Sequence, residues 1–281
     1  SLGTIQTMGF SIDGKLLVSR DRRVCLYRVT DGGCAEQARE EFDSFSLASD
    51  RPVCVLWTSG EARLIVWDLE RNTRSALDVD QPISRAFLSA DASVVCVEFL
   101  QRGFTVFSST GERLIETGSQ DGLDTLCIGW DGNRPLLFGQ ERFLEDPGRL
   151  VVADLISGQK YWGPGLESGV SATFWDSESV LYSMSDQPLK RWWPFTNRLE
   201  SLAVPSRPGP VLSLTCTRTG TVLMQYLEGG FAIHDTRALA EYGRIDSVGP
   251  LVDLACSDDG RMLVSMNCDG KLAFWDVQRN A

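Results

Sequence analysis

The feature that most constrains this chain is a pattern of short apolar segments that repeats about every 40 residues. In the last copy, three apolar runs at 251–256, 262–266 and 271–277 are separated by Asp259-Gly260 and Asp269-Gly270. Asp-Gly between apolar runs predicts a tight turn, because Gly accepts positive φ and Asp bonds its own backbone. The copy is therefore predicted to be an antiparallel meander that ends in Trp275-Asp276.

The position of Trp275 recurs in every copy, with spacings of 40, 40, 46, 40, 41 and 41 residues. Its occupants are Tyr27, Trp67, Phe107, Ala153, Trp193, His234 and Trp275. The second copy matches the last without a gap over residues 49–68. A period of this length, held across the chain, indicates a repeat architecture in which each copy is one supersecondary unit.

The paired turns and the terminal Trp-Asp resemble the WD-repeat β-propeller family. Two copies keep the dipeptide, at Trp67-Asp68 and Trp275-Asp276. Ser265, Asp269 and Trp275 match part of the family's buried hydrogen-bond network. The family's Gly-His dipeptide is absent, since His234 is the single histidine and stands at the Trp position. The resemblance implies an all-β fold, namely a seven-bladed β-propeller of four-stranded antiparallel blades.

We predict one domain over residues 1–281. Its seven blades are expected at about 4–30, 42–69, 83–108, 123–155, 170–195, 211–236 and 251–277, with linking outer strands between them. The polar segment 34–41 is expected to be either the first outer strand or a surface turn, and the apolar run 94–99 is expected to be buried on both faces. No strand precedes the first copy, so one outer strand is expected to be missing. Either residues outside this sequence supply it, or the last blade has three strands.

The spacing of 46 places extra residues at 141–148, between the second and third strands of the fourth copy. Insertions collect in loops, and loops carry function on a rigid scaffold. This segment is therefore expected to be either a functional loop or a tolerated surface insertion.

The composition limits the environment and the partners of the chain. A formal net charge of -11 disfavours binding to nucleic acid, where neutralisation of phosphates dominates affinity. No apolar run is long enough to span a membrane. The eight cysteines form no CxxC pair, and six lie in apolar segments, which favours buried free thiols over disulfides or zinc ligands. Those six are Cys25, Cys54, Cys96, Cys127, Cys216 and Cys256. Free thiols point to a reducing compartment, the cytoplasm.

Catalysis is not expected. His234 lies in the middle of a predicted strand, where it fills the Trp position in the core and cannot serve a Ser-His-Asp triad. The acidic residues fall mostly in turns, where they bond the local backbone, so neither a metal site nor a cofactor is predicted. The chain is interpreted as a non-enzyme.

The resemblance implies that several interstrand loops share one face, and arginines gather in those loops. Arginine and aromatic side chains are common anchors of interfaces, so we predict a partner-binding surface there. Its members are Arg20, Arg22, Arg23, Arg85, Arg102, Arg142, Phe143 and Arg207. The expected partner is a protein or an acidic or phosphorylated peptide. The alternative for residues 20–23 is a charged turn that serves solubility alone.

The function predicted from these features is a non-catalytic protein–protein interaction module. It would be a scaffold or sensor domain of a larger intracellular protein, covalently attached to another domain outside this sequence. Two alternatives stay open: a propeller enzyme or small-ligand binder that uses the central channel, and a structural assembly subunit.

Overall fold

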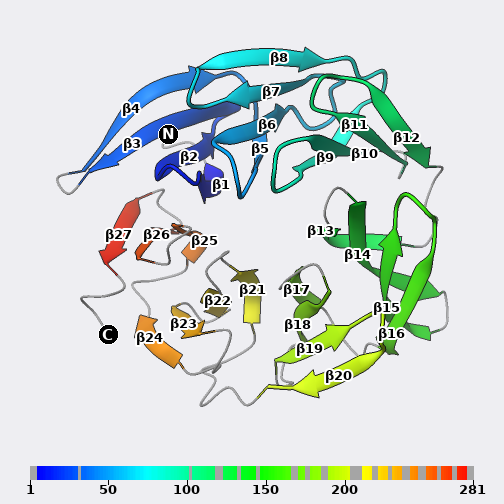
Figure 1. Ribbon diagram of the computed structural model, residues 1–281. Coiled ribbons are helices and arrows are strands. Elements are labelled where there is room, and N and C mark those ends of the chain that lie inside the picture. Colours follow the sequence, from blue (N-terminus) through cyan, green and yellow to red (C-terminus); the bar gives the residue numbers. More distant parts are fainter. Residues whose placement is uncertain are drawn as a thin grey trace. The chain divides into compact units, whose positions relative to one another are not determined.

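The computed structural model describes residues 5–30, 33–100, 103–117, 123–131, 134–143, 146–165, 170–174, 178–184, 189–202, 211–216, 221–226, 230–235, 241–245, 251–257, 261–267 and 271–276. All regular elements in these ranges are β-strands (Figure 1). The same ranges hold no helix long and apolar enough to cross a membrane. The chain divides into two compact units, residues 1–120 with 252–275, and residues 121–251 with 276–281.

The first unit contains three four-stranded sheets and one three-stranded sheet, each ordered along the chain. The first two sheets are β1 (Ile5–Phe10), β2 (Lys15–Arg20), β3 (Arg23–Thr30) and β4 (Gly33–Glu40), then β5 (Ser44–Leu47), β6 (Val53–Trp57), β7 (Leu64–Asp68) and β8 (Thr73–Leu77). The other two are β9 (Ile83–Leu88), β10 (Val94–Phe99), β11 (Phe104–Ser108) and β12 (Arg113–Thr117), then β25 (Leu251–Cys256), β26 (Met262–Asn267) and β27 (Leu272–Asp276).

The second unit contains three four-stranded sheets with the same sequential order. Their strands are β13 (Leu123–Asp131), β14 (Arg134–Phe143), β15 (Asp146–Asp154) and β16 (Lys160–Gly165), then β17 (Val170–Phe174), β18 (Val180–Met184), β19 (Lys190–Trp193) and β20 (Arg198–Ser201), and then β21 (Val211–Cys216), β22 (Thr221–Tyr226), β23 (Phe231–Asp235) and β24 (Glu241–Ile245).

The sheets correct the predicted blade count. Six of them have the four antiparallel strands of a blade, whereas the described residues of β25–β27 form a sheet of three. The described part of the chain therefore holds six four-stranded blades and not the seven predicted. The predicted outer strand at 34–41 is confirmed as β4, and the predicted apolar strand β10 is buried at all six positions.

The insertion at 141–148 is not the loop that we predicted. It lengthens the hairpin of β14 and β15, whose register continues to Phe143 opposite Asp146. A strand ladder is held by main-chain hydrogen bonds, so it runs on through polar sequence. Insertion of a few residues on both sides of a turn therefore extends the two strands together.

Apolar side chains fill the spaces between neighbouring sheets of the first unit. One cluster joins Leu17, Leu26 and Phe42 to Leu56 and Trp67. Another joins β9–β11 to the β5–β8 sheet around Val55, Leu64 and Val95. Each sheet is thus covered by its neighbour, which explains why alternating polarity is weak in the inner strands.

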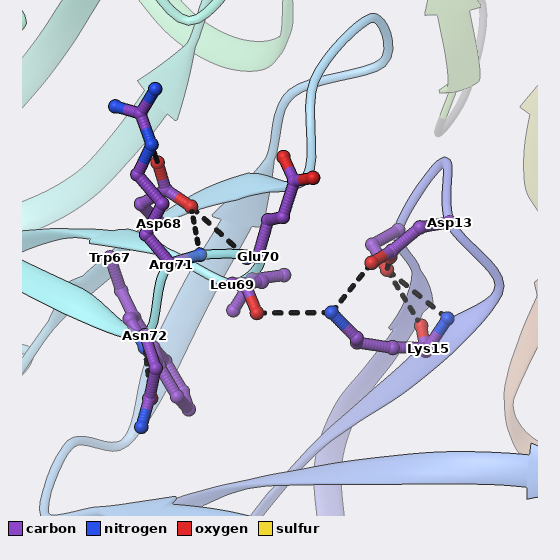
Figure 2. A network of polar contacts seen from close by, with 9 residues as sticks. Asp13, Lys15, Trp67, Asp68, Leu69, Glu70, Arg71 and Asn72 are labelled. Atoms are coloured by element: carbon purple, nitrogen blue, oxygen red, sulfur yellow. Dashed lines mark hydrogen bonds and ion pairs between the residues drawn. The ribbon is translucent and has the colours of Figure 1, made fainter.

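The Trp-Asp dipeptide of the second sheet organises the turn that follows it (Figure 2). The Asp68 carboxylate accepts hydrogen bonds from the N–H groups of Glu70 and Arg71, at 3.0 and 2.8 Å. Lys15 reaches this turn from the first sheet, where its Nζ donates to the carbonyl of Leu69 at 3.0 Å and pairs with Asp13 at 2.6 Å. The aspartate therefore caps a turn, and the lysine fastens that turn to β2.

Several single-residue predictions can be compared with the fold. Trp275 Nε1 donates to Ser265 Oγ at 2.9 Å, which confirms that pair of the expected network; Asp269 lies outside the described residues. His234 is fully buried in β23, as predicted for a core position. Among the predicted thiols, Cys25, Cys54 and Cys96 are buried and not in disulfides, whereas Cys127 and Cys256 are not in disulfides and are only half-buried.

Candidate functional site

The hairpin of β2 and β3 positions three of the predicted arginines. Its two turn residues, Asp21 and Arg22, have φ of 51° and 60°, the conformation of a two-residue hairpin turn that matches strand twist. Arg20 and Arg23 are directly opposite each other across the ladder, so both side chains lie on one face of the sheet. The turn therefore separates Arg22 from the other two.

Arg22 extends toward the neighbouring sheet, where its Nη2 lies 2.9 Å from Glu61 Oε1. Both side chains are largely exposed, so this ion pair contributes little to stability. The turn that holds Glu61 is bound to the chain around residue 83, since the N–H of Gly60 donates to the carbonyl of Ile83 at 2.8 Å. In the first unit, loops of neighbouring sheets thus meet at one end, as the resemblance implied.

Arg20 and Arg23 line a cleft of about 260 Å³ in the first unit. Most of its wall comes from β2, β3 and β4, and one residue comes from β27. The lining residues are Val18, Arg20, Asp21, Arg23, Cys25, Tyr27, Glu36, Arg39 and Leu272. Three guanidinium groups and two carboxylates therefore share a small open space.

The cleft lies where one face of the β1–β4 sheet is only partly covered. The inner part of this face, at Met8, Leu16 and Val18, packs against buried residues of β25 and β26. Leu272 of β27 packs at the margin of the same cluster. Farther out, Cys25, Tyr27 and the two charged residues of β4 face the cleft. The same sheet face thus changes from apolar core to charged surface.

The charges in the cleft are unevenly compensated. Arg39 donates two hydrogen bonds to Glu36, each 3.0 Å long, and this pairing raises the pKa of Arg39. Arg20 Nε lies 3.4 Å from Asp21. Arg23 is exposed, and among the described residues it has no ion-pair or hydrogen-bond partner. The cleft therefore keeps an excess of positive charge on a chain whose net charge is -11.

Tyr27 adds a polar group with little tendency to ionise. Burial, and then the neighbouring Cys25 and Glu36, raise the pKa of Tyr27 to about 12. Its hydroxyl stays neutral at physiological pH and keeps its proton for donation to an anionic ligand.

Three residues of the cleft were not predicted from the sequence, namely Tyr27, Glu36 and Arg39. Residues three apart on a regular strand point to opposite faces, so Glu36 and Arg39 were not expected together. A bulge in β4 changes this, because Leu26 pairs with Ala38 while Tyr27 pairs with Glu36, and Gln37 is the extra residue. The one feature of the sequence that could have indicated this pair is a Glu and an Arg three residues apart in a polar outer strand.

The other predicted partner contacts either lie away from the cleft or belong to residues that the structure does not describe. Arg85 of β9 is opposite Glu98 of β10 and forms an ion pair with it at 2.9 Å. Arg102 and Arg207 lie outside the described residues, and Arg142 and Phe143 are at the end of β14 with side chains that are not described. Of the four predicted residues whose side chains the structure describes, it thus brings together two, Arg20 and Arg23.

Other arginines stack on the repeating aromatic position. In three sheets the outer-strand residue opposite that aromatic is an arginine: Arg74 with Trp67, Arg113 with Phe107 and Arg198 with Trp193. The guanidinium carbons lie 4.7, 5.8 and 4.3 Å from the ring centres. These contacts belong to blade packing, which distinguishes them from the arginines of the cleft.

No metal-binding cluster of three or more His, Cys, Asp or Glu side chains occurs in the described part of the chain. The cleft lacks histidine, and Cys25 at its wall is buried. What this arrangement offers chemically is recognition of anions by guanidinium groups.

The sequential four-stranded antiparallel sheets are those of an all-β protein of the β-propeller class. The comparison with solved structures agrees: a chain in the crystal structure of the mitotic checkpoint complex aligns with a TM-score of 0.72. The alignment covers 96% of this chain and 89% of that chain at 15% sequence identity. At this identity the likeness shows the fold and not membership of the WD-repeat family. No family model matches the sequence, and no curated protein matches it either.

Proposed function

We propose that this chain is a non-catalytic protein-interaction module that binds an acidic or phosphorylated segment of a partner protein. The observation that carries the proposal is the cleft in which Arg20, Arg23 and Arg39 converge. Guanidinium groups bind carboxylate and phosphate oxygens through paired, charge-assisted hydrogen bonds. Arg23 is available for such a bond without the loss of an existing partner among the described residues.

The charge distribution favours a peptide over a nucleic acid. A chain with net charge -11 repels a long polyanion, whereas a short acidic segment interacts mainly with the charges closest to it. A larger partner would extend over the loop end of the sheets, and there we retain Arg22, Arg85, Arg102, Arg142, Phe143 and Arg207 as predicted contacts.

We further propose that residues 1–281 act as one propeller. It would be the scaffold or sensor part of a larger cytoplasmic protein. The likeness to a chain in a structure titled as a complex is consistent with a role in assembly. The free thiols of the described residues are consistent with a reducing compartment.

The proposal is tested by affinity capture from lysate followed by titration of the captured partner. The Arg23→Glu variant should weaken binding about tenfold or more, because it replaces an attraction by a repulsion. Arg51→Glu is the matched control: it makes the same charge change at an exposed position of the same unit, outside the cleft and outside the predicted contacts. Equal loss in the two variants would show only a general effect of charge. Unchanged binding by Arg23→Glu would refute the cleft as the site.

A further inference from the structure

The outer edge of β27 differs from that of every other third strand. In the six four-stranded sheets the third strand pairs with an outer strand, whereas β27 pairs only with β26 among the described residues (Figure 1). The N–H of Asn267 donates to the carbonyl of Lys271 at 3.2 Å, at the start of this hairpin. Because main-chain groups alternate along a strand and the Lys271 carbonyl bonds β26, those of Ala273 are expected to point to β26. Those of Leu272 and Phe274 are then expected to point to the edge that has no fourth strand among the described residues.

The cleft lies beside this edge. Leu272 of β27 lines the cleft together with Glu36 and Arg39 of β4. Elsewhere in the first unit the corresponding position is filled by an outer strand: β8 pairs with β7 and also touches β4, through an ion pair of Arg74 with Glu40 at 2.5 Å. A fourth strand on β27 would lie over the other face of β4 in the same manner.

Side chains on that strand would face defined surroundings. Its residues alternate, so every second side chain points toward Arg20, Arg23 and Arg39, where a carboxylate fits. Phe274 is 40% exposed, and Leu272 is half-buried, so strand addition would also cover apolar surface. A second copy of the chain fits less well, because its β27 would present Leu272 and Phe274 to the arginines and only one carboxylate, that of Asp276.

We propose that β27 accepts an extended acidic segment of a partner protein as its fourth strand. The main chain of the segment bonds Leu272 and Phe274, while its alternate carboxylates bind the arginines of the cleft. This is recognition by strand addition, in which the main chain supplies affinity and the side chains supply specificity. The inference rests on the proposed function, since it specifies how the same cleft holds its ligand.

The probe for the test is a capped eight-residue peptide that alternates glutamate with threonine, titrated by fluorescence anisotropy against the whole 281-residue chain. Phe274→Pro removes an N–H that points outward and leaves the pairing with β26 intact, because proline is tolerated on an open edge. Phe274→Ala keeps that N–H and loses only the ring. We expect Phe274→Pro to weaken binding at least tenfold and Phe274→Ala to weaken it less than threefold.

Two further measurements do not depend on the folding of a proline variant. N-methylation of every second peptide residue should abolish binding in one of the two alternations and spare it in the other, because only one set of N–H groups faces β27. Hydrogen exchange on the wild-type chain should show slower exchange of the Leu272 and Phe274 amides when the peptide is bound. Absence of both effects would overturn strand addition.

The outcomes separate this inference from the proposed function. If Arg23→Glu loses the peptide but neither proline nor N-methylation matters, the arginines bind an acidic segment without strand pairing, and only the inference fails. If Arg23→Glu binds as well as wild type, the proposed function fails. If sedimentation shows a dimer that Phe274→Pro dissociates and the peptide does not, a second copy occupies the edge, and the inference is also overturned.

Discussion

Replacing Asp253 with asparagine should change the way the stability of this chain depends on pH. Asp253 lies in β25, where its carboxylate accepts the N–H of Met8 in β1 at 2.7 Å and the N–H of Leu254 at 2.9 Å. Burial outweighs these hydrogen bonds and raises the pKa of Asp253 from 3.8 to about 6. The group therefore holds its proton more tightly in the folded chain than in the unfolded one.

The sign and size of the effect follow from this difference. A raised carboxyl pKa gives stability that is fully present below pH 3.8 and is lost as the pH rises through 6. A difference of about two pKa units corresponds to about 3 kcal/mol in the free energy of unfolding. The asparagine of the Asp253→Asn variant does not ionise. Its amide faces two N–H donors, however, and its oxygen can accept from only one of them, which costs about 1 kcal/mol at every pH.

The assay is urea unfolding followed by tryptophan fluorescence between pH 4.0 and 7.5. We expect Asp253→Asn to be about 0.5 kcal/mol less stable than wild type near pH 4, where the carboxyl of the unfolded chain is already partly ionised, and about 2 kcal/mol more stable at pH 7.5. Asp78→Asn, at an exposed position, controls for the loss of one surface carboxylate. Parallel stability curves for Asp253→Asn and wild type would refute the reasoning, because they would mean that this carboxyl titrates alike in both states.

Three other substitutions test the packing of the sheets, each by its free energy of unfolding in urea. Gly163→Ala should destabilise the chain by about 1–3 kcal/mol, since a Cβ there would lie 2.9 Å from the Trp192 ring; Gly165→Ala, whose nearest atom is 3.9 Å away, should be close to neutral. Lys15→Met should lower the free energy of unfolding by about 1 kcal/mol, because it removes the hydrogen bond to the Leu69 carbonyl. The control is Lys271→Met at an exposed position, and an equal effect of the two substitutions would contradict this prediction. Arg74→Ala should cost about 1 kcal/mol through loss of its stack on Trp67 and its pair with Glu40, whereas Arg71→Ala, 80% exposed on that side chain, should change little.

The repeat period was sufficient to predict the strands and their order. Segments such as 94–99 and 251–256 were placed without error, because an apolar run between turn residues can satisfy its main chain only in a sheet. The tight turn at residues 20–23 was predicted as well, and the strand pairing in the structure then puts Arg20 and Arg23 on one face. These features depend on neighbours in the sequence.

The structure of the insertion and the composition of the charged cleft could not be predicted from the sequence, because main-chain pairing and a bulge decide them. Whether residues 141–148 loop out or lengthen a hairpin is decided by main-chain pairing, which polar side chains do not reveal. The bulge at Gln37 shifts Glu36 and Arg39 onto one face, and no alternation pattern encodes such a shift. For this reason, Glu36 and Arg39 could not be predicted from the sequence as residues of the cleft.

The sequence by itself thus determined that the chain is built from repeating antiparallel sheets, because periodicity and turn chemistry are local properties. Only the tertiary structure decided which charges meet. It brought Leu272 of the last sheet into one cleft with Tyr27 and Arg39 of the first sheet, more than 230 residues earlier in the chain. It also left the edge of β27 without a fourth strand among the described residues. Contacts between residues so far apart in the sequence depend on how one sheet packs on the next. The residue pattern within a single repeat does not determine that packing.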